Sequence, residues 1–267
     1  TKISQKELIG TLNTVIFCPE ELQLIKGTPS GRRRFLDMEI SQTSATYYHQ
    51  LMQYNRLLQQ RNAVLKEYRG KQNIPLEEWD LQLADMASFI VKKRLESLKK
   101  INLLIDLMNR KLTGGLENLT IGYEQPYMDN GSLEYTKEGF YERIKAALPQ
   151  DRHRMTTSVG PHRDDLRFFS DAMDLKKFGS QGQQRTAVLS LKLSELEFIK
   201  SEVGEYPVLL LDDVLSELDE SRRANLLQFI HKRIQTFITT TDIHDFKDLK
   251  SVQFISCEGG KVQYGQP

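Results

Sequence analysis

Two long apolar stripes at helical spacing constrain this chain more than any other feature of its sequence. Between residues 30 and 113, apolar and aromatic side chains recur every three or four positions, and the pattern pauses only at 70–75. The paired glycines at 114–115 end it, as glycines often do after a helix. Arg61 and Arg94 each occupy a slot in the stripes. Two long helices with seams near a 3.5-residue period predict an antiparallel helical hairpin that forms an arm.

The segments on either side of this arm are α/β in character. Residues 206–213, YPVLLLDD, form a continuous apolar run that is typical of a strand buried on both faces. An amphipathic helix and a second strand-like run, TFITTT, follow it. This alternation predicts an α/β fold with a parallel sheet and flanking helices. Further strand-like segments are 14–17, 119–124, 166–169 and a hairpin that turns at Gly259-Gly260.

The composition of the chain limits its class and its partners. Thirty-seven Lys and Arg residues stand against 36 Asp and Glu among 267 residues, so any surface for a polyanion has to be local. Two cysteines, Cys18 and Cys257, are typical of a reducing cytosol and provide no disulfide framework. No apolar run approaches the roughly 18 residues of a membrane span. We therefore expect a cytoplasmic protein with no membrane partner.

Asp212 and Asp213 directly follow the continuous apolar run. In a parallel sheet, ligands gather at the carboxyl ends of strands, and two adjacent carboxylates there need a compensating partner. A hard cation such as Mg²⁺, with a phosphate behind it, is the usual partner. The alternative interpretation is that two solvated acids simply begin a turn.

The stretch FGSQGQQRTAVLSLKLSELEF, residues 178–198, places small and amide side chains at the start of a helix. Ser180 fits an N-cap and Gln183 fits the matching capping-box position, which is the plainer explanation. Capping alone does not account for Gly179, Gly182 and the additional glutamines. Free backbone N–H groups at the positive end of a helix form a cradle for anions. The stretch is therefore a candidate phosphate site.

Taken in order, these motifs resemble those of the ABC-type ATPases. The matching parts are a signature motif (Ser180-Gln181-Gly182-Gln183), a Walker B strand (Val208 to Asp213), a D-loop (216–219) and a switch strand (239–242). Four longer blocks resemble the RecF family of bacterial recombination mediators: FCPEELQLIKGTPSGRRRFLD, VGPHRDDL, FGSQGQQRTAVLSLKLSELEF and VLLLDDVLSELDESRR. The blocks span residues 17–223, which is most of the chain.

The resemblance implies an ATP-binding and DNA-binding protein of DNA repair, recombination, replication and the SOS response to DNA damage. Such a protein forms a homodimer when ATP is bound. It binds double-stranded DNA at gap junctions, and it works with RecO and RecR to load RecA at single-strand gaps. The cofactors implied are ATP and Mg²⁺.

The same resemblance implies a role for each matched residue. Asp212 would hold Mg²⁺. Asp213, which stands where most of these ATPases have Glu, is the candidate catalytic base. The signature motif would contact the γ-phosphate of ATP bound by the other subunit. Asp219 would line the dimer seam. Thr241 occupies the switch position that is usually His, and His244 follows three residues later.

No G-x-x-x-x-G-K-[ST] motif occurs in the sequence, so the phosphate-gripping lysine of a Walker A loop is missing. In the resembled family this motif comes early in the chain. We therefore expect the C-terminal part of a longer ATPase, which on its own hydrolyses no ATP. Its expected parts are the end of ATPase lobe I (1–27), the helical arm (28–115) and ATPase lobe II (116–267).

Several basic residues of the arm are candidate DNA contacts, namely Arg32, Arg33, Lys92, Lys93 and Lys99. Plain solvated helix faces are the alternative explanation for them. The run 162–165, His-Arg-Asp-Asp, has residue types that bind metals, although a salt-bridged turn leading into a strand explains it better.

Two other classes of function stay open at this point. One is a non-enzymatic docking or scaffold module built on the helical arm. The other is a Mg²⁺-dependent nuclease, in which Asp164 and Asp165 would join the twin aspartates, Asp212 and Asp213. The nuclease leaves the signature motif unexplained.

Overall fold

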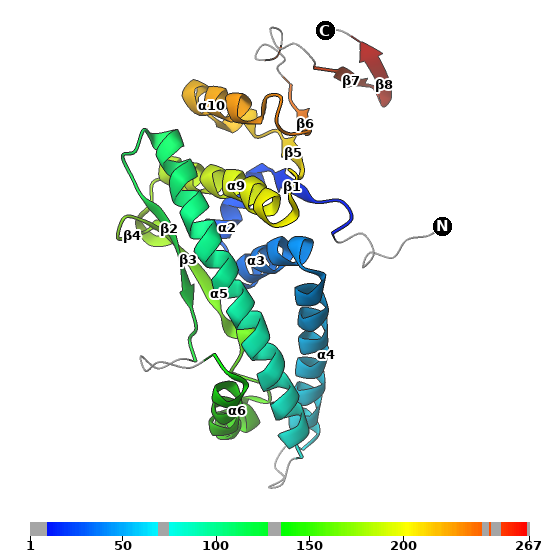
Figure 1. The fold of residues 1–267 in the computed structure, drawn as a ribbon, viewed down its shortest axis with the longest axis vertical. Helices are drawn as coiled ribbons and strands as arrows, with labels where there is room; N and C mark the ends of the chain where they lie inside the picture. The colour runs from blue at the N-terminus through cyan, green and yellow to red at the C-terminus, as the bar shows by residue number, and fades with distance from the viewer. Residues whose placement is uncertain (1–9, 69–74, 128–134, 242–245, 247–251, 266–267) are drawn as a thin grey trace.

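The computed structural model describes residues 10–68, 75–127, 135–241, 246 and 252–265. The molecule is elongated, with two long helices running toward one end and a parallel sheet at the other (Figure 1). In the part of the chain that the structure describes, no helix is both long and apolar enough to cross a membrane.

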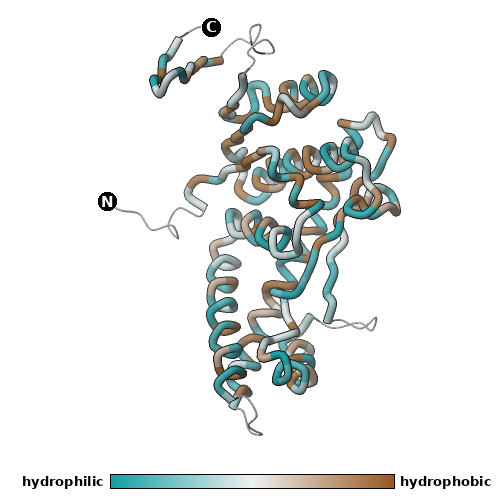
Figure 2. Tube along the Cα trace, turned by 180° about the vertical axis from the view of Figure 1, so that it is seen from behind, coloured by the Kyte–Doolittle hydropathy of each residue, from teal (hydrophilic) through white to brown (hydrophobic). Residues whose placement is uncertain are grey.

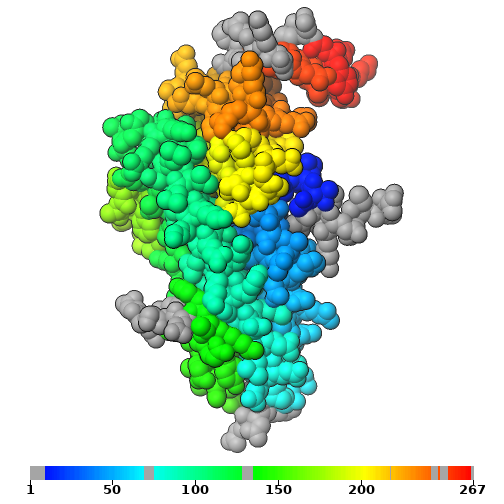
Figure 3. Space-filling view, viewed as in Figure 1, coloured from blue at the N-terminus to red at the C-terminus, as the bar shows by residue number. Residues whose placement is uncertain are grey.

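The parallel sheet consists of three strands in the order β1-β5-β6. Val15 of β1 lies opposite Leu209 of β5, so segments almost 200 residues apart in sequence are direct neighbours. Figure 3 shows the same relationship on the surface, where the N-terminal residues lie beside those of α9. This arrangement confirms the predicted parallel sheet with flanking helices. The strands are β1 (Thr14–Phe17), β5 (Val208–Asp212) and β6 (Thr236–Thr239), and the helices nearby in sequence are α9 (Gln181–Val203) and α10 (Glu220–Ile230).

The continuous apolar run of β5 is not buried on both faces. Leu209 and Leu211 are buried, whereas Leu210 on the opposite face is half-buried. Leu210 aligns across the sheet with Ile16 and Phe237, which are 48% and 54% exposed. The expectation was wrong because no described element covers that second face.

The predicted helical arm is confirmed. Helices α4 (Ala45–Glu67) and α5 (Glu77–Thr113) pack along each other, and α5 with its 37 residues is about 55 Å long (Figure 1). The predicted break at 70–75 lies almost wholly outside the described residues. Gly114 ends α5 in a left-handed conformation with φ 70°, which a glycine adopts without strain.

Two buried arginines fasten the arm to the rest of the molecule. Arg61 of α4 forms ion pairs with Asp80 of α5 at 2.6 Å and with Asp151 at 2.7 Å. Arg94 of α5 pairs with Asp37 at 2.8 Å and is also close to Asp164. These are the two residues that interrupt the apolar stripes, so their positions mark charged crosslinks within the core.

A second, antiparallel sheet packs against α5 in the order β2-β3-β4. Helix α6 packs on α5 as well, and α3 contacts both β3 and α9. Short elements complete this region. The bounds are α3 (Pro29–Thr43), β2 (Leu119–Glu124), α6 (Lys137–Ala146), α7 (Leu148–Arg154), β3 (Asp165–Ser170), β4 (Met173–Asp174) and α8 (Leu175–Phe178), with short helices η1 (Pro19–Leu22), α2 (Gln23–Lys26), η2 (Pro161–Arg163) and η3 (Leu215–Glu217).

The predicted C-terminal hairpin is also present, as β7 (Phe254–Glu258) and β8 (Lys261–Gly265). Hydrophobic and hydrophilic residues alternate along most of the hairpin (Figure 2). The division at residues 27 and 115 stays a prediction. Strand β1, from the first predicted part, shares its sheet with β5 and β6 from the last.

Candidate active site

The twin aspartates lie at the carboxyl end of β5, where Asp212 is the last residue of the strand. Thr239, the last residue of the neighbouring strand β6, contacts both of them. Its hydroxyl donates to Asp212 Oδ1 at 2.6 Å and accepts from the backbone N–H of Asp213 at 3.1 Å. The carboxyl ends of two parallel strands are thereby joined by one side chain. Both aspartates are exposed and therefore open to a ligand.

Asp213 adopts a left-handed backbone conformation with φ 52°. Such a conformation is uncommon for a residue other than glycine, and it concentrates at functional sites. Here it turns the chain sharply at the end of the strand. Ser216 holds the turn by donating its hydroxyl to the carbonyl oxygen of Asp213 at 2.8 Å.

Buried apolar residues anchor the predicted D-loop and the turn before it, while two of its polar residues are exposed. Val214, Leu215 and Leu218 are buried, whereas Ser216 and Asp219 are exposed. Asp219 caps α10 by accepting a hydrogen bond from the backbone N–H of Arg222 at 2.9 Å. The loop therefore has a fixed shape and a polar outer edge.

The signature motif forms the N-terminal end of α9 and contains a complete capping box. Ser180 Oγ accepts from the backbone N–H of Gln183 at 3.2 Å, and Gln183 Oε1 accepts from the backbone N–H of Ser180 at 3.0 Å. The predicted capping is confirmed. Ser180, Gln181 and Gly182 are exposed, so this end of the helix is accessible to a ligand.

The two glycines of this stretch differ in what the fold demands of them. A Cβ on Gly179 would lie 2.6 Å from the carbonyl oxygen of Leu175, so the fold itself requires glycine there. A Cβ on Gly182 would meet nothing closer than Ser180 Oγ at 4.0 Å. Packing within the chain therefore gives no reason for a glycine at 182, and the open space leaves room for a close approach from outside.

The signature motif and the twin aspartates lie at opposite ends of α9. The helix begins beside β2 and β4 and ends near β5 (Figure 1). The helix itself, with its 23 residues, is about 35 Å long, and the twin aspartates follow β5, the strand that comes after it. The structure thus brings together Asp212, Asp213 and Thr239, but it does not bring the signature motif to them within one copy of the chain.

The residue beside the twin aspartates is Thr239, which the sequence analysis did not single out. Thr241, the predicted switch residue, is exposed and lies two residues beyond the end of β6. Asp242 and His244 lie outside the described residues. In the observed register TFIT runs parallel to LLLD, which places Thr239 opposite Asp212.

The donor set at this edge suits Mg²⁺. Mg²⁺ prefers hard oxygen ligands and is usually held by one or two carboxylates together with the phosphates of a substrate. Asp212 and Asp213 offer such carboxylates. Within the described ranges, no group of three or more His, Cys, Asp or Glu side chains is placed to hold a metal. Water and a bound phosphate would complete the coordination of such an ion.

The candidate DNA contacts fall into two kinds. Arg32 is only 3% exposed, and its guanidinium donates to both carboxylate oxygens of Asp165 at 2.7 and 2.9 Å. Its role in the structure is to join α3 to β3. Lys92 and Lys99 are exposed on α5, and Lys93 lies 3.7 Å from Glu96. Lys92 and Lys99 are seven residues apart and so share one face of the helix.

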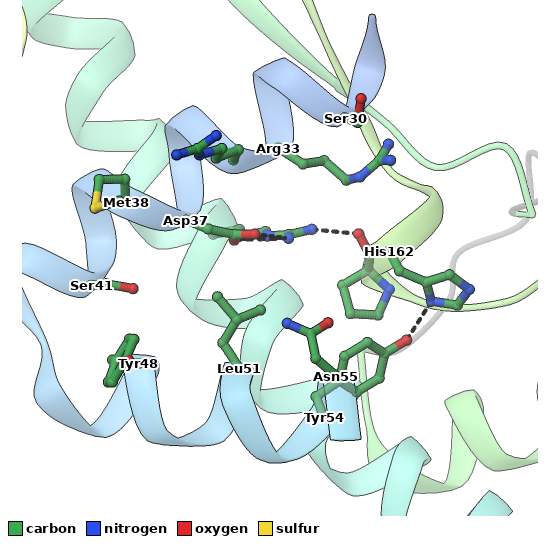
Figure 4. Close-up of a pocket in the computed structure, with 13 residues that line it drawn as sticks. Ser30, Arg33, Asp37, Met38, Ser41, Tyr48, Leu51, Tyr54, Asn55 and His162 are labelled. Carbon is green, nitrogen blue, oxygen red and sulfur yellow. Dashed lines mark hydrogen bonds and ion pairs between the residues drawn. The ribbon is translucent and has the colours of Figure 1, made fainter. Parts of the chain in front are cut away.

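Arg33 lies at the rim of a cavity of about 380 Å³ between α3 and α4 (Figure 4). Its guanidinium donates to the carbonyl oxygen of Asp164 at 2.7 Å. Burial, and next the neighbouring charge of Arg94, lower the pKa of Arg33. The cavity wall also contains Arg34, Tyr54 and His162. An excess of positive charge at this rim favours anions.

The predicted salt-bridged turn at 162–165 is confirmed. Asp165 pairs with Arg32, and the buried Asp164 pairs with Arg94 and accepts from two tyrosine hydroxyls. His162 Nδ1 lies 2.6 Å from the hydroxyl of Tyr54, and its Nε2 lies 3.0 Å from the carbonyl oxygen of Thr157 (Figure 4). These partners assign the proton to Nε2. The turn is a structural crosslink and contributes no acids to the twin aspartates.

Two curated proteins and two solved structures that resemble this chain carry the same protein name. No family model matches the chain. The chain is 49% identical over 250 residues to the DNA replication and repair protein RecF of Alkaliphilus oremlandii, covering 93% of this chain and 68% of that protein. It is 46% identical to the protein of the same name from Halothermothrix orenii, over 92% of this chain and 67% of that one.

A solved structure described as the recombination mediator protein RecF-ATP in the RecFOR pathway is also similar. It superimposes with a TM-score of 0.88 at 36% identity, over 99% of this chain and 70% of that one. A companion structure, described as RecF-ATPrS, gives the same TM-score. The fold of the chain is thus that of a protein whose solved form is described with ATP.

Proposed function

Because the chain belongs to the RecF family of DNA replication and repair proteins, we propose that it provides half of a nucleotide site shared between two copies. The signature motif of one copy and the twin aspartates of the other would close around one ATP. The observation that carries this proposal is the contact of Thr239 with Asp212 and Asp213, which assembles an acidic, oxygen-rich edge at the carboxyl ends of β5 and β6.

The chain's own residues divide the work at such a site. Asp212, oriented by Thr239, would hold Mg²⁺, whose charge would stabilise the phosphate oxygens. Asp213 would orient the attacking water and accept its proton. The exposed amides at the start of α9, with Ser180 Oγ, would face the γ-phosphate, because a helix N-terminus favours negative charge. Asp219 would line the seam between the copies.

The chain itself contains no Walker A motif, so we expect it to hydrolyse no ATP on its own. The test therefore uses a chimera that joins this chain to the part of the Alkaliphilus oremlandii protein that it does not cover, where we expect the Walker A motif. With ATP, the chimera should pair and then separate as the nucleotide is hydrolysed. The substitution Asp213→Asn should leave two copies of the chimera paired, with ATP trapped between them.

Sedimentation with and without ATP measures this pairing. We expect the Asp213→Asn chimera to sediment as a dimer with ATP and as a monomer without it. A matched control is Asp85→Asn, on an exposed aspartate of α5. If Asp213→Asn behaves like Asp85→Asn and neither pairs with ATP, the shared site is refuted and a docking or scaffold function gains support.

We infer that DNA is a partner from the family of the chain and from basic residues on its surface. We include Lys92, Lys99 and Arg33 in the proposed DNA surface, with Lys93 held partly by Glu96. Arg32 is left out because its guanidinium is buried against Asp165. The same proposal includes a wider role. Two copies would pair with ATP on double-stranded DNA at gap junctions and help RecO and RecR to load RecA.

A nuclease is not favoured by the geometry. It would need acids from neighbouring strand ends, and Asp164 and Asp165 were the candidates. Both lie at the start of β3, in the other sheet, where they are paired with arginines. They do not reach the carboxyl edge that carries Asp212.

A further inference from the structure

Glu117 contacts the signature motif from outside it. The residue lies between the end of α5 and the start of β2, 63 to 66 positions before the motif. Its Oε1 accepts a hydrogen bond from the side-chain Nε2 of Gln183 at 3.0 Å. Gln183 uses its other amide atom, Oε1, to cap the backbone N–H of Ser180. Glu117 therefore holds the side chain that completes the capping box.

Glu117 is in turn fixed by two elements of the protein. Its second carboxylate oxygen accepts from the hydroxyl of Ser170 in β3 at 2.7 Å, and Ser170 is buried. Its backbone carbonyl accepts from the side-chain amide of Asn109 in α5 at 2.9 Å. Asn109 is buried too, and its Oδ1 accepts from Ser190 in α9. The carboxylate thus has a defined position when it meets Gln183.

A carboxylate suits this position chemically. An ionised Glu only accepts hydrogen bonds, and each of its two oxygens here meets one donor, the amide of Gln183 or the hydroxyl of Ser170. With the amide nitrogen engaged, the oxygen of Gln183 is left to point at Ser180. Without Glu117 the amide is free to rotate, and the cap that Gln183 Oε1 provides on the backbone N–H of Ser180 is weakened.

We propose that Glu117 is a positioning residue for the signature motif. It links the C-terminal end of α5 to the N-terminal end of α9, which would face the nucleotide. The part of this inference that concerns ATP rests on the proposed function. The part that concerns the capping box does not, because it depends only on contacts within the chain. Asn109 of α5 contacts the backbone of Glu117, so a displacement of α5 at Asn109 would be felt at Glu117, whose carboxylate contacts Gln183 of the signature motif.

The first experiment uses the chain as it stands and follows amide hydrogen exchange by NMR. Glu117→Ala should speed exchange of the Ser180 and Gln183 amide protons roughly fivefold, the effect of losing one ordinary hydrogen bond. Glu117→Gln should restore slow exchange, since an amide can accept from Gln183 and donate to Ser170. The matched control is Glu124→Ala, at the other end of β2, where the side chain pairs with Arg167. Equal exchange in Glu117→Ala and Glu124→Ala would overturn the proposal.

The second experiment measures the ATP concentration at half-maximal pairing of the chimera. Glu117→Ala should raise this midpoint about fivefold, with Glu117→Gln and Glu124→Ala close to the unsubstituted chimera. An unchanged midpoint overturns the link to the nucleotide. If the unsubstituted chimera does not pair with ATP, the proposed function fails, and the exchange data alone decide whether Glu117 positions Gln183. Equal melting temperatures for Glu117→Ala and Glu124→Ala would show that both variants are folded.

Discussion

Thr239 and Asp212 end neighbouring parallel strands, and the threonine hydroxyl donates a hydrogen bond to the aspartate at 2.6 Å. The same hydroxyl accepts from the backbone of Asp213. One small side chain thus orients a proposed metal ligand and supports the strained turn that carries the proposed base. This relationship gives the site its geometry before any nucleotide arrives.

The first prediction concerns this hydroxyl. Thr239→Val keeps the shape of the side chain but removes both hydrogen bonds, so ATP turnover by the chimera should fall about 10- to 100-fold, as is usual when a partner of a metal ligand is lost. Thr239→Ser should restore most of the rate. The control is Thr236→Val at the other end of β6, where the hydroxyl donates to the carbonyl oxygen of Ile234. Turnover that is equal in the two valine variants would refute the role of Thr239.

The second prediction concerns the buried arginine of α4. Arg61→Met leaves Asp80 and Asp151 without their shared partner, and removing one member of a buried ion pair typically costs about 3–5 kcal/mol in the free energy of unfolding. The matched control is Arg56→Met, on an exposed arginine of the same helix. Urea denaturation measures both. A loss for Arg61→Met no larger than for Arg56→Met would show that the crosslink does not stabilise the arm.

The third prediction concerns the pH dependence of stability. Burial lowers the pKa of His162 to about 4, and the positive charges of Arg163, Arg33 and Arg94 act in the same direction. The unfolded chain binds this proton near pH 6.5, so the folded state should lose stability as the pH falls from 6.5 toward 4.

Melting temperatures across this pH range test the effect. The melting temperature of the unsubstituted chain should fall more steeply than that of His162→Gln. The control, His153→Gln, changes an exposed histidine and should follow the unsubstituted chain. A parallel fall in all three proteins would contradict a neutral, half-buried His162.

The fourth prediction concerns DNA. Replacing Lys92 and Lys99 with Gln removes two exposed charges from one face of α5, so binding of the chimera to duplex DNA should weaken for all sequences. The slope of log affinity against log salt should become shallower by about two. Lys137→Gln with Lys145→Gln, on α6, changes the net charge equally and serves as the control. An unchanged slope in the first double variant would remove this face from the proposed DNA surface.

Features encoded by local sequence were predictable, and contacts between distant segments were not. The arm followed from the spacing of apolar residues. The start of α9 followed from Ser180, and the end of α5 followed from Gly114. Arg61 and Arg94 stood out as interruptions, yet their partners come from helices and loops up to 90 residues away. No local pattern identifies those acids.

The site shows the same division. Asp212, Asp213 and the signature motif were recognised because each is a compact motif. Thr239 and Glu117 were missed because their importance depends on strand register and on a contact across 66 residues. The exposed second face of the parallel sheet was missed for a related reason. An apolar run shows that a strand is hydrophobic, but it does not show which faces are covered.

Mixing two inactive variants of the chimera tests the shared site most directly. Ser180→Arg disables the signature motif and Asp213→Asn disables the base, so each variant alone should hydrolyse almost no ATP. If two copies share each nucleotide, a mixed dimer has one intact site. Because half of the dimers are mixed, a 1:1 mixture combined before ATP is added should regain about a quarter of the unsubstituted rate. A mixture no more active than the sum of its parts would contradict the account.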